Sequence, residues 1–271
     1  MYNQDKEKRG INMIYQKELH FLKTTIRSIY DQVNHQFKEI RLKGHQNVVT
    51  STDLFIEKTF REKVQEAFPN DRVIGEEQTK DGVLKSRTWI IDPIDGTSNY
   101  AANLNLFVVQ VALYDENDLV LAFIYVPYSN DIYYAIKGHG AYFNDERYTG
   151  TKESDHGTFM ISMVGMTRQH FDRSKFNTIL QLSLTNEYKL RVLGSIGLEM
   201  ALTSQGVFDL FYTNVTNLWD ICPGLLLLKE AGLAVVNEKG LPYQIGDQHL
   251  FVYRNEMAKK IMEEHLLEKQ K

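Results

Sequence analysis

The sequence is poor in cysteine, in excess positive charge and in long apolar runs, and each scarcity excludes a class of protein. The single cysteine, Cys222, cannot form an intrachain disulfide and fits a reducing compartment. The formal net charge is -4, which argues against a surface that coats nucleic acid. No apolar run approaches the roughly 18 residues that a membrane-spanning helix needs. We therefore expect a cytoplasmic protein without a nucleic-acid or membrane partner.

The rest of the composition is that of an ordinary folded chain, with 271 residues, 43% hydrophobic and 24% charged. This length suffices for one large domain with a sizeable core. We predict a single domain over residues 13–269, made of two closely joined lobes at about 13–150 and 151–269. The first twelve residues are polar and charged, so we expect a flexible extension and not a signal peptide, with Met13 as an alternative start.

Apolar residues recur with both helical and strand periods. Steps of three and four residues from Leu19 to Ile40 predict a long helix over 14–43 that ends at Gly44. A second helix is predicted with Thr52 or Asp53 as its N-cap and an end near Phe68. Further helices are predicted at 173–184, 195–205, 219–231 and 255–268. Strands are predicted at 73–74, 88–91, 107–113, 119–125, 132–136, 159–164, 188–193, 208–212, 233–236 and 250–253. The mixture favours a layered α/β (α+β) fold with mixed sheets.

The most informative segment is Asp92-Pro93-Ile94-Asp95-Gly96-Thr97, which follows the strand-like run Thr88–Ile91. Two carboxylates three residues apart, on a turn that Pro93 stiffens and Gly96 loosens, suit a hard cation such as Mg²⁺ or Ca²⁺. The same six residues also fit an Asp-rich turn with an aspartate as a helix cap, which is common in α/β proteins. Taken alone, the segment leaves both interpretations open.

Other acidic residues fall at predicted strand ends or helix starts, where α/β folds place ligand sites. They are Asp53, Glu76, Glu77 and Asp220. Asp220 follows Trp219 and opens a helix whose first turn is predicted to contain Pro223. Each acid by itself also fits a solvated or capping residue. Their recurrence at the ends of apolar elements favours one shared site.

Three segments together resemble the signature of the inositol monophosphatase family. They are Val73–Glu77, Trp89–Thr97 and Trp219-Asp220, and the likeness runs from about residue 14 to 265. The family belongs to a superfamily of lithium-sensitive, Mg²⁺-dependent phosphomonoesterases that includes fructose-1,6-bisphosphatases and 3′-phosphoadenosine 5′-phosphate phosphatases. The resemblance implies an alternating αβαβα sandwich of the sugar-phosphatase type with mixed sheets. It also implies a homodimer.

The resemblance further implies roles for individual residues. Glu76, Asp92 and the carbonyl of Ile94 are implied ligands of one Mg²⁺, and Asp92, Asp95 and Asp220 of a second, with a third, weaker ion near Glu76. The implied catalytic residues are Glu76, Thr97 and Asp53, the last two beside the attacking water. The residues implied at the substrate are Asp95, Gly96, Thr97, Ile196, Thr213 and Asp220.

The chain departs from the family pattern on the side of the leaving alcohol. Thr213 occupies the position, seven residues before Asp220, where the family usually carries a glutamate. Ile196 follows Gly194-Ser195 where a small residue is common, and Met166 replaces a serine. Glu199 and Asp209 are candidates to compensate for the lost polar groups. A site with fewer hydroxyl-binding groups discriminates less strongly among alcohols.

We therefore expect a Mg²⁺-dependent phosphomonoesterase that hydrolyses inositol-1-phosphate or related small phosphate monoesters by attack of an activated water. One alternative is a nucleotide phosphatase acting on the 2′-phosphate of NADP or on 3′-phosphoadenosine 5′-phosphate. A more remote alternative is a non-catalytic phosphate-binding relative. It is disfavoured because the implied ligands and Thr97 are all present.

Overall fold

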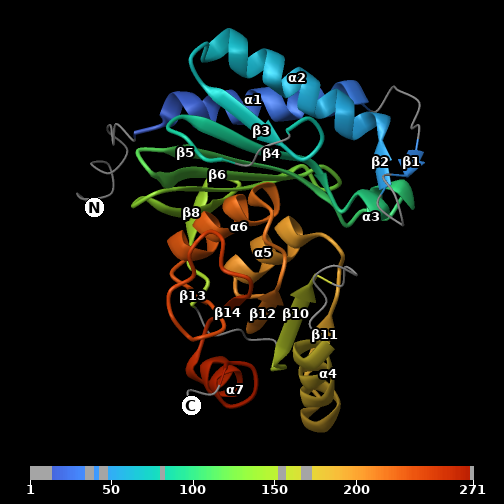
Figure 1. The fold of residues 1–271 in the computed structure, drawn as a ribbon, viewed down its shortest axis with the longest axis vertical. Coiled ribbons are helices and arrows are strands. Elements are labelled where there is room, and N and C mark those ends of the chain that lie inside the picture. Colours follow the sequence, from blue (N-terminus) through green and yellow to red (C-terminus); the bar gives the residue numbers. More distant parts are fainter. Residues whose placement is uncertain are drawn as a thin grey trace, which may run out of the picture.

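Helices and sheets alternate in layers through the molecule (Figure 1). The computed structural model describes residues 14–33, 40–42, 48–79, 83–151, 157–165 and 173–268. The helices in these ranges are α1 (Gln16–Val33), α2 (Ser51–Ala67), α3 (Thr97–Ala101), α4 (Arg173–Asn186), α5 (Ile196–Ser204), α6 (Leu218–Glu230) and α7 (Glu256–His265). None of them combines the length and apolarity that crossing a bilayer requires.

The larger sheet has seven strands that follow one another in chain order. They are β3 (Arg72–Gly75), β4 (Thr88–Asp95), β5 (Val108–Asp115), β6 (Asp118–Val126), β7 (Asp131–Ile136), β8 (Gly140–Phe143) and β9 (Glu146–Tyr148). Only β3 and β4 pair in parallel, and every later pair is antiparallel. The predicted hairpin at 107–125 is confirmed as β5 and β6.

The smaller sheet has five strands in the order β11-β10-β12-β14-β13. They are β10 (Met160–Val164), β11 (Lys189–Arg191), β12 (Leu210–Thr213), β13 (Ala234–Val236) and β14 (Leu250–Tyr253). β10 is parallel to both β11 and β12, whereas β14 is antiparallel to β12 and β13. Both sheets therefore mix the two kinds of pairing, as the sequence predicts. A separate two-stranded ladder joins β1 (Ile40–Leu42) to β2 (Val48–Thr50).

Three apolar cores separate the layers. α1 and α2 cover the outer face of the larger sheet, and α4 and α7 cover the outer face of the smaller one (Figure 1). α5 and α6 fill the space between the two sheets. Because α6 is covered on both sides, its Leu225–Leu228 run is wholly buried and lacks an amphipathic pattern. The order of layers confirms the predicted αβαβα sandwich.

The predicted helix over 14–43 is wrong in its second part. α1 ends at Val33, and Ile40 pairs with Thr50 in the β1–β2 ladder. Ile40 keeps the apolar spacing of a helix, but strand pairing overrides that local pattern. Gly44, the predicted end of the helix, lies outside the described residues.

Two predictions about helix starts are also wrong. Thr50, not Thr52 or Asp53, caps α2, because its hydroxyl accepts from the backbone N–H groups of both residues. Asp53 instead completes a capping box by accepting from the Thr50 backbone. In α6, Pro223 lies in the second turn and not in the first, because the helix begins at Leu218.

Candidate active site

A β-bulge brings Asp92 and Asp95 to the same face of β4. The two aspartates are three residues apart, but their partners on β5, Gln110 and Val108, are only two apart. In a regular strand, residues three apart point to opposite faces. The extra residue in β4 removes this alternation, so both carboxylates face the α5–α6 layer. The predicted strand 88–91 thus continues through the acidic motif itself.

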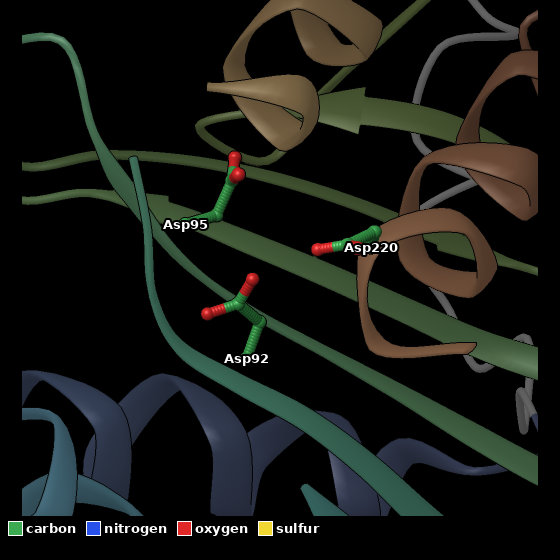
Figure 2. A group of neighbouring side chains, drawn as sticks. All are labelled: Asp92, Asp95 and Asp220. Atoms are coloured by element: carbon green, nitrogen blue, oxygen red, sulfur yellow. The ribbon is translucent and has the colours of Figure 1, made fainter. Parts of the chain in front are cut away.

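Asp220, from the first turn of α6, completes a group of three carboxylates. Each of Asp92, Asp95 and Asp220 contributes one oxygen, and these oxygens all lie within 4.8 Å of one another. Figure 2 shows Asp220 reaching from its helix toward the two residues on β4. Asp220 lies 125 positions after Asp95 in the chain, so distant segments form one oxygen-rich cluster, which is the ligand chemistry that Mg²⁺ prefers.

Burial raises the pKa values of this cluster, and for Asp92 and Asp220 the neighbouring charges add to the effect. Burial, followed by the charges of Glu76 and the other two aspartates, raises the pKa of Asp92 well above its usual value. Burial and the charge of Asp95 raise the pKa of Asp220 to about 7. Asn217 opposes this shift by donating to Asp220 Oδ2 at 2.7 Å. The predicted ligand Glu76 thus lies close enough to act on Asp92. Several acids crowded together in this way favour a bound cation.

Asp95 also connects the larger sheet to helix α5. It accepts hydrogen bonds from Ser195 Oγ at 2.6 Å and from the backbone N–H groups of Ile196 at 3.1 Å and Gly197 at 2.6 Å. Burial raises the pKa of Asp95 to about 6, although these bonds lower it. A strand of the larger sheet is therefore fixed to the N-terminus of α5 through one carboxylate.

The metal-free protein is expected to lose stability as the pH rises from about 4 to 7. The raised pKa values of Asp92, Asp95 and Asp220 mean that the folded chain holds more protons than the unfolded chain above the usual value of 3.8. The stabilisation is complete below that value and is lost as the pH passes the folded-state values of about 6 and 7. We expect a loss on the order of 2–3 kcal/mol in urea unfolding with EDTA.

Saturating Mg²⁺ is the control for this pH series. It should flatten most of the decline, because the ion favours the charged carboxylates. A smaller decline should remain, because burial also raises the pKa values of Asp53 and, to about 7, of Glu199. If the metal-free stability is constant or rises over this range, the proposed crowding of charges is wrong.

Thr97 and Asp53 form a second polar pair beside the cluster. Thr97 Oγ1 lies 2.9 Å from the Ile94 carbonyl oxygen and 3.3 Å from Asp53 Oδ1. Asp53 Oδ2 already accepts from the N–H and hydroxyl of Thr50 at 2.8 and 2.5 Å. The capping box therefore fixes the carboxylate so that its other oxygen faces Thr97.

Gly96 adopts a backbone conformation that other residues rarely take. Its φ is +92°, and an added Cβ would lie 2.9 Å from the Leu106 carbonyl oxygen and 3.1 Å from Ser195 Cβ. Asn99 strengthens this close approach by donating to the carbonyls of Leu106 and Leu193, both at 2.7 Å. Glycine is thus required where β4 turns into α3 against the Gly194–Ser195 turn.

The sequence interpretation missed Glu57, which holds the loop that carries Glu76. Glu57 is fully buried, and its carboxylate accepts from the N–H groups of Glu77 at 2.8 Å and Gln78 at 3.2 Å. Arg61, one turn later on α2, donates to Glu57 Oε1 at 2.7 Å and to the Val73 carbonyl at 2.7 Å. The i, i+4 spacing from Asp53 to Glu57 to Arg61 was the available signal.

Glu57→Gln is expected to weaken metal binding near the loop that carries Glu76 rather than to destabilise the fold as a whole. The amide would turn an N–H donor toward the Glu77 or Gln78 N–H, which displaces Glu76. We expect the Mg²⁺ concentration for half-maximal activity to rise about 10-fold. Glu62→Gln on the same helix is the matched control, because Glu62 is exposed. Equal Mg²⁺ dependence in both variants would show that Glu57 does not position Glu76.

The residues predicted on the alcohol side lie in the interior. Thr213 is fully buried, and its hydroxyl accepts from the Val215 N–H at 3.1 Å. Ile196 is 3% exposed and belongs to the central core. Their contact with substrate stays a prediction, and Met166 lies outside the described residues. Cys222 is buried, and burial raises the pKa of its thiol to about 12, as expected for a packing residue and not a nucleophile.

Glu199 and Asp209 both have structural partners. Glu199 accepts from the Ser162 hydroxyl and from the N–H groups of Leu193 at 2.9 Å and Gly194 at 3.0 Å. Asp209 forms a buried ion pair with Arg254. Glu199 thus shapes the turn next to Asp95, whereas Asp209 joins elements of the smaller sheet.

Comparison with known proteins identifies the family to which the chain belongs. A model of the inositol monophosphatase family matches residues 15–271. The chain belongs to the inositol monophosphatase family. An inositol monophosphatase of Dictyostelium discoideum is 35% identical over 220 residues, covering 78% of this chain and 80% of the relative. An inositol-1-monophosphatase of Bacillus subtilis (strain 168) is 30% identical over 241 residues, covering 87% and 90%.

Three further proteins are similar to this chain in sequence or fold. A protein of Aquifex aeolicus (strain VF5) named fructose-1,6-bisphosphatase/inositol-1-monophosphatase is 29% identical over 236 residues, covering 83% of this chain and 87% of the relative. The extragenic suppressor protein suhB from Bartonella henselae has a TM-score of 0.79 at 24% identity, covering 91% of this chain and 95% of its own. An IMPase/NADP phosphatase solved with Mg²⁺ and phosphate has a TM-score of 0.74 at 21% identity, covering 91% and 93%. These structures share the fold.

The inositol monophosphatase family consists of phosphatases that act on small phosphorylated compounds, and this chain is one of its members. The acidic cluster lies in the segments that carry the family resemblance, Trp89–Thr97 and Trp219-Asp220. The all-oxygen donor set of this cluster fits a divalent cation such as Mg²⁺.

Proposed function

We propose that the protein is a Mg²⁺-dependent phosphomonoesterase that hydrolyses inositol-1-phosphate or related small phosphate monoesters. The observation that carries the proposal is the group of three aspartate oxygens within 4.8 Å of one another, in a chain of a phosphatase family. The donor set is wholly oxygen, and the raised pKa values of Asp92, Asp95 and Asp220 favour a cation between them.

We propose that two or three ions bind here. Glu76, Asp92 and the Ile94 carbonyl would hold one, and Asp92, Asp95 and Asp220 would hold a second. The Ile94 carbonyl accepts from Thr97 Oγ1 and keeps a further lone pair for a ligand. When bound, such ions neutralise the phosphate charge, acidify a water molecule and stabilise the charge on the leaving oxygen.

Thr97 and Asp53 would orient the attacking water. The single Thr97 hydroxyl proton is directed toward the Ile94 carbonyl and Asp53, so its oxygen is left as an acceptor. A water on that side would donate to Thr97 and turn a lone pair toward phosphorus, with Glu76 receiving its second proton. The backbone N–H groups of Gly96 and Thr97 open α3 and would contact the phosphate oxygens. Asp95 and Asp220 would face the alcohol side.

Substrate preference tests this proposal. We expect Mg²⁺-dependent phosphate release from inositol-1-phosphate, with kcat/KM measured beside fructose-1,6-bisphosphate, NADP and 3′-phosphoadenosine 5′-phosphate. A preference of roughly 100-fold for a nucleotide is too large for one apolar contact and would replace the inositol assignment. Absence of Mg²⁺-dependent release from all four compounds would contradict phosphatase activity.

A nucleotide phosphatase is the second candidate, and exposed apolar side chains near the site favour it. Leu104, Leu106 and Val192 are 51%, 36% and 41% exposed. Leu106 and Leu193, the neighbour of Val192, both bind Asn99 through their carbonyls. Apolar surface beside a phosphate site suits a nucleobase. The NADP and adenosine bisphosphate arms of the substrate test decide between the two candidates.

We further propose a cytoplasmic homodimer that lithium inhibits. The family resemblance supports the dimer and the inhibition, and the single cysteine supports the compartment. Light scattering of the pure protein and a lithium dose–response of phosphate release test the first two claims. A monomer, or activity unaffected by lithium, would remove the corresponding claim.

A further inference from the structure

Gln110 is an unusual residue for its surroundings. It lies on β5 with no exposed surface, and neither of its amide atoms has a hydrogen-bond partner among the residues that the structure describes. Native proteins seldom leave both ends of a buried amide unpaired. An apolar side chain of the same size would fit the surrounding core without losing contacts with water. The presence of glutamine therefore calls for partners that arrive with a ligand.

The sheet register places Gln110 beside the acidic cluster. Its partner on β4 is Asp92, so both side chains leave the sheet on the same face. Residues directly opposite on antiparallel strands have Cβ atoms about 4.5–5.5 Å apart. Val108 and Ala112 have the same orientation on β5 and belong to the core that contains α5 and α6. Gln110 thus extends toward the space that the three aspartates share.

Helix α5 encloses the other side of the amide. A Cβ added to Gly197 would lie 2.5 Å from Gln110 Oε1, so the amide lies directly against the first turn of the helix. The N–H of the same glycine donates to Asp95 at 2.6 Å. Gln110 is therefore confined between Asp92 on its own sheet and the helix turn that binds Asp95.

We propose that Gln110 is a positioning residue for the metal centre, where its amide binds a water molecule in the hydration shell of the Mg²⁺ held by Asp92. Mg²⁺ keeps several waters when it binds protein, and a buried water needs about three hydrogen bonds. Gln110 Oε1 supplies an acceptor for a proton of such a water, whose oxygen binds the ion. This inference rests on the proposed Mg²⁺ site, and it concerns a residue outside the ligand set.

Thermal unfolding across a Mg²⁺ titration, without substrate, tests the inference. In EDTA, Gln110→Met should raise Tm by about 2–4 °C, because it removes an unpaired buried amide. The Mg²⁺ concentration for half-maximal stabilisation should rise about 10-fold, because the water loses its partner. Gln110→Leu should show the same two effects. Agreement between the two variants excludes a folding defect specific to one of them as the cause.

Thr88→Val is the matched control on the same sheet. Thr88 is fully buried at the other end of β4, and its hydroxyl donates to the Lys85 carbonyl at 2.8 Å. This variant should lower Tm with and without Mg²⁺ and leave the Mg²⁺ midpoint unchanged, because the lost bond lies away from the site.

The outcomes separate this inference from the proposed function. If both Gln110 variants keep the wild-type Mg²⁺ midpoint, Gln110 only fills space and the inference is wrong. If Mg²⁺ does not stabilise the wild type, the metal centre fails and the inference fails with it. If Mg²⁺ binding depends on Gln110 but no phosphate monoester is hydrolysed, the inference stands and the proposed function is wrong.

Discussion

Asp92→Asn is expected to abolish phosphate release and at the same time to stabilise the metal-free protein. Asp92 is the member of the cluster on which the charges of Glu76, Asp95, Asp220 and Asp53 all act. The asparagine keeps an oxygen for the Ile94 N–H, which now donates to Asp92 Oδ1 at 3.1 Å. Metal ligation at such a site supplies several kcal/mol to the transition state, so we expect a loss of about 10³-fold in kcat/KM.

The stability change has the opposite sign because the mutation removes a crowded charge. At pH 8 with EDTA, we expect the free energy of unfolding to increase by about 0.5–2 kcal/mol. Asp118→Asn is the control with the same change of charge, at an exposed residue that pairs with Lys137. It should leave kcat/KM unchanged. Full activity of Asp92→Asn would contradict the metal assignment, whereas inactivation with lower stability would contradict the charge argument.

Asp95→Asn is expected to lose about as much activity as Asp92→Asn. Unlike Asp92→Asn, it is expected to destabilise the fold. Its two oxygens accept three hydrogen bonds from residues 195–197, and an asparagine must turn its amino group toward one of these donors. A buried donor left unsatisfied costs about 1–3 kcal/mol, which exceeds the relief of repulsion. The change should therefore lower the free energy of unfolding, although it removes the same charge as Asp92→Asn.

Urea unfolding of the two variants side by side, in EDTA at pH 8, measures this difference directly. We expect Asp92→Asn to be more stable than the wild type and Asp95→Asn to be less stable. Ser195→Ala is a useful companion, because it keeps the Asp95 carboxylate and removes a hydroxyl that donates to Asp95 Oδ2 and accepts weakly from the Leu198 N–H at 3.4 Å. It should show a smaller loss of stability, about 1 kcal/mol. If Asp95→Asn is as stable as Asp92→Asn, the hydrogen bonds between β4 and α5 contribute little to the free energy of unfolding.

The mixed α/β character and the positions of the acidic residues are predictable from local signals in the sequence, whereas the αβαβα order of layers is implied by the family resemblance. Apolar periodicity locates the main strands, and an unbroken apolar run locates the buried α6, whereas the family resemblance relates residues 73–97 to Asp220. The β-bulge is not predictable in this way. It is visible only in the register between β4 and β5, yet it is what directs Asp92 and Asp95 to the same face.

Residues that position the site are harder to predict than residues that form it. Glu57 acts through the backbone of Glu77 and Gln78, and its role depends on how α2 lies against β3. Gln110 resembles any polar residue in a strand until its burial is known. The short strands β8 and β9 and the ladder of β1 with β2 were missed because three or four residues carry little periodic pattern.

The predicted residues on the alcohol side of the proposed site lie in the protein interior. Thr213 and Ile196 are buried, so neither side chain presents the polar groups that bind sugar hydroxyls. Among the exposed residues next to the Gly194–Ser195 turn, Leu106 and Val192 are apolar, and their chain neighbours Asn105 and Arg191 are polar or charged. Broad specificity among small phosphate esters follows from this distribution if the phosphate supplies most of the binding energy.

The most direct test of the metal centre is a crystal soaked in Mn²⁺ and phosphate, with the ions located by anomalous scattering. The account predicts at least two ions about 3.5–4 Å apart, bridged by Asp92. Glu76 and the Ile94 carbonyl should bind one ion, and Asp95 and Asp220 the other, with phosphate beside Gly96 and Thr97. Ions bound elsewhere at saturating Mn²⁺, or an acidic cluster without any ion, would contradict the account.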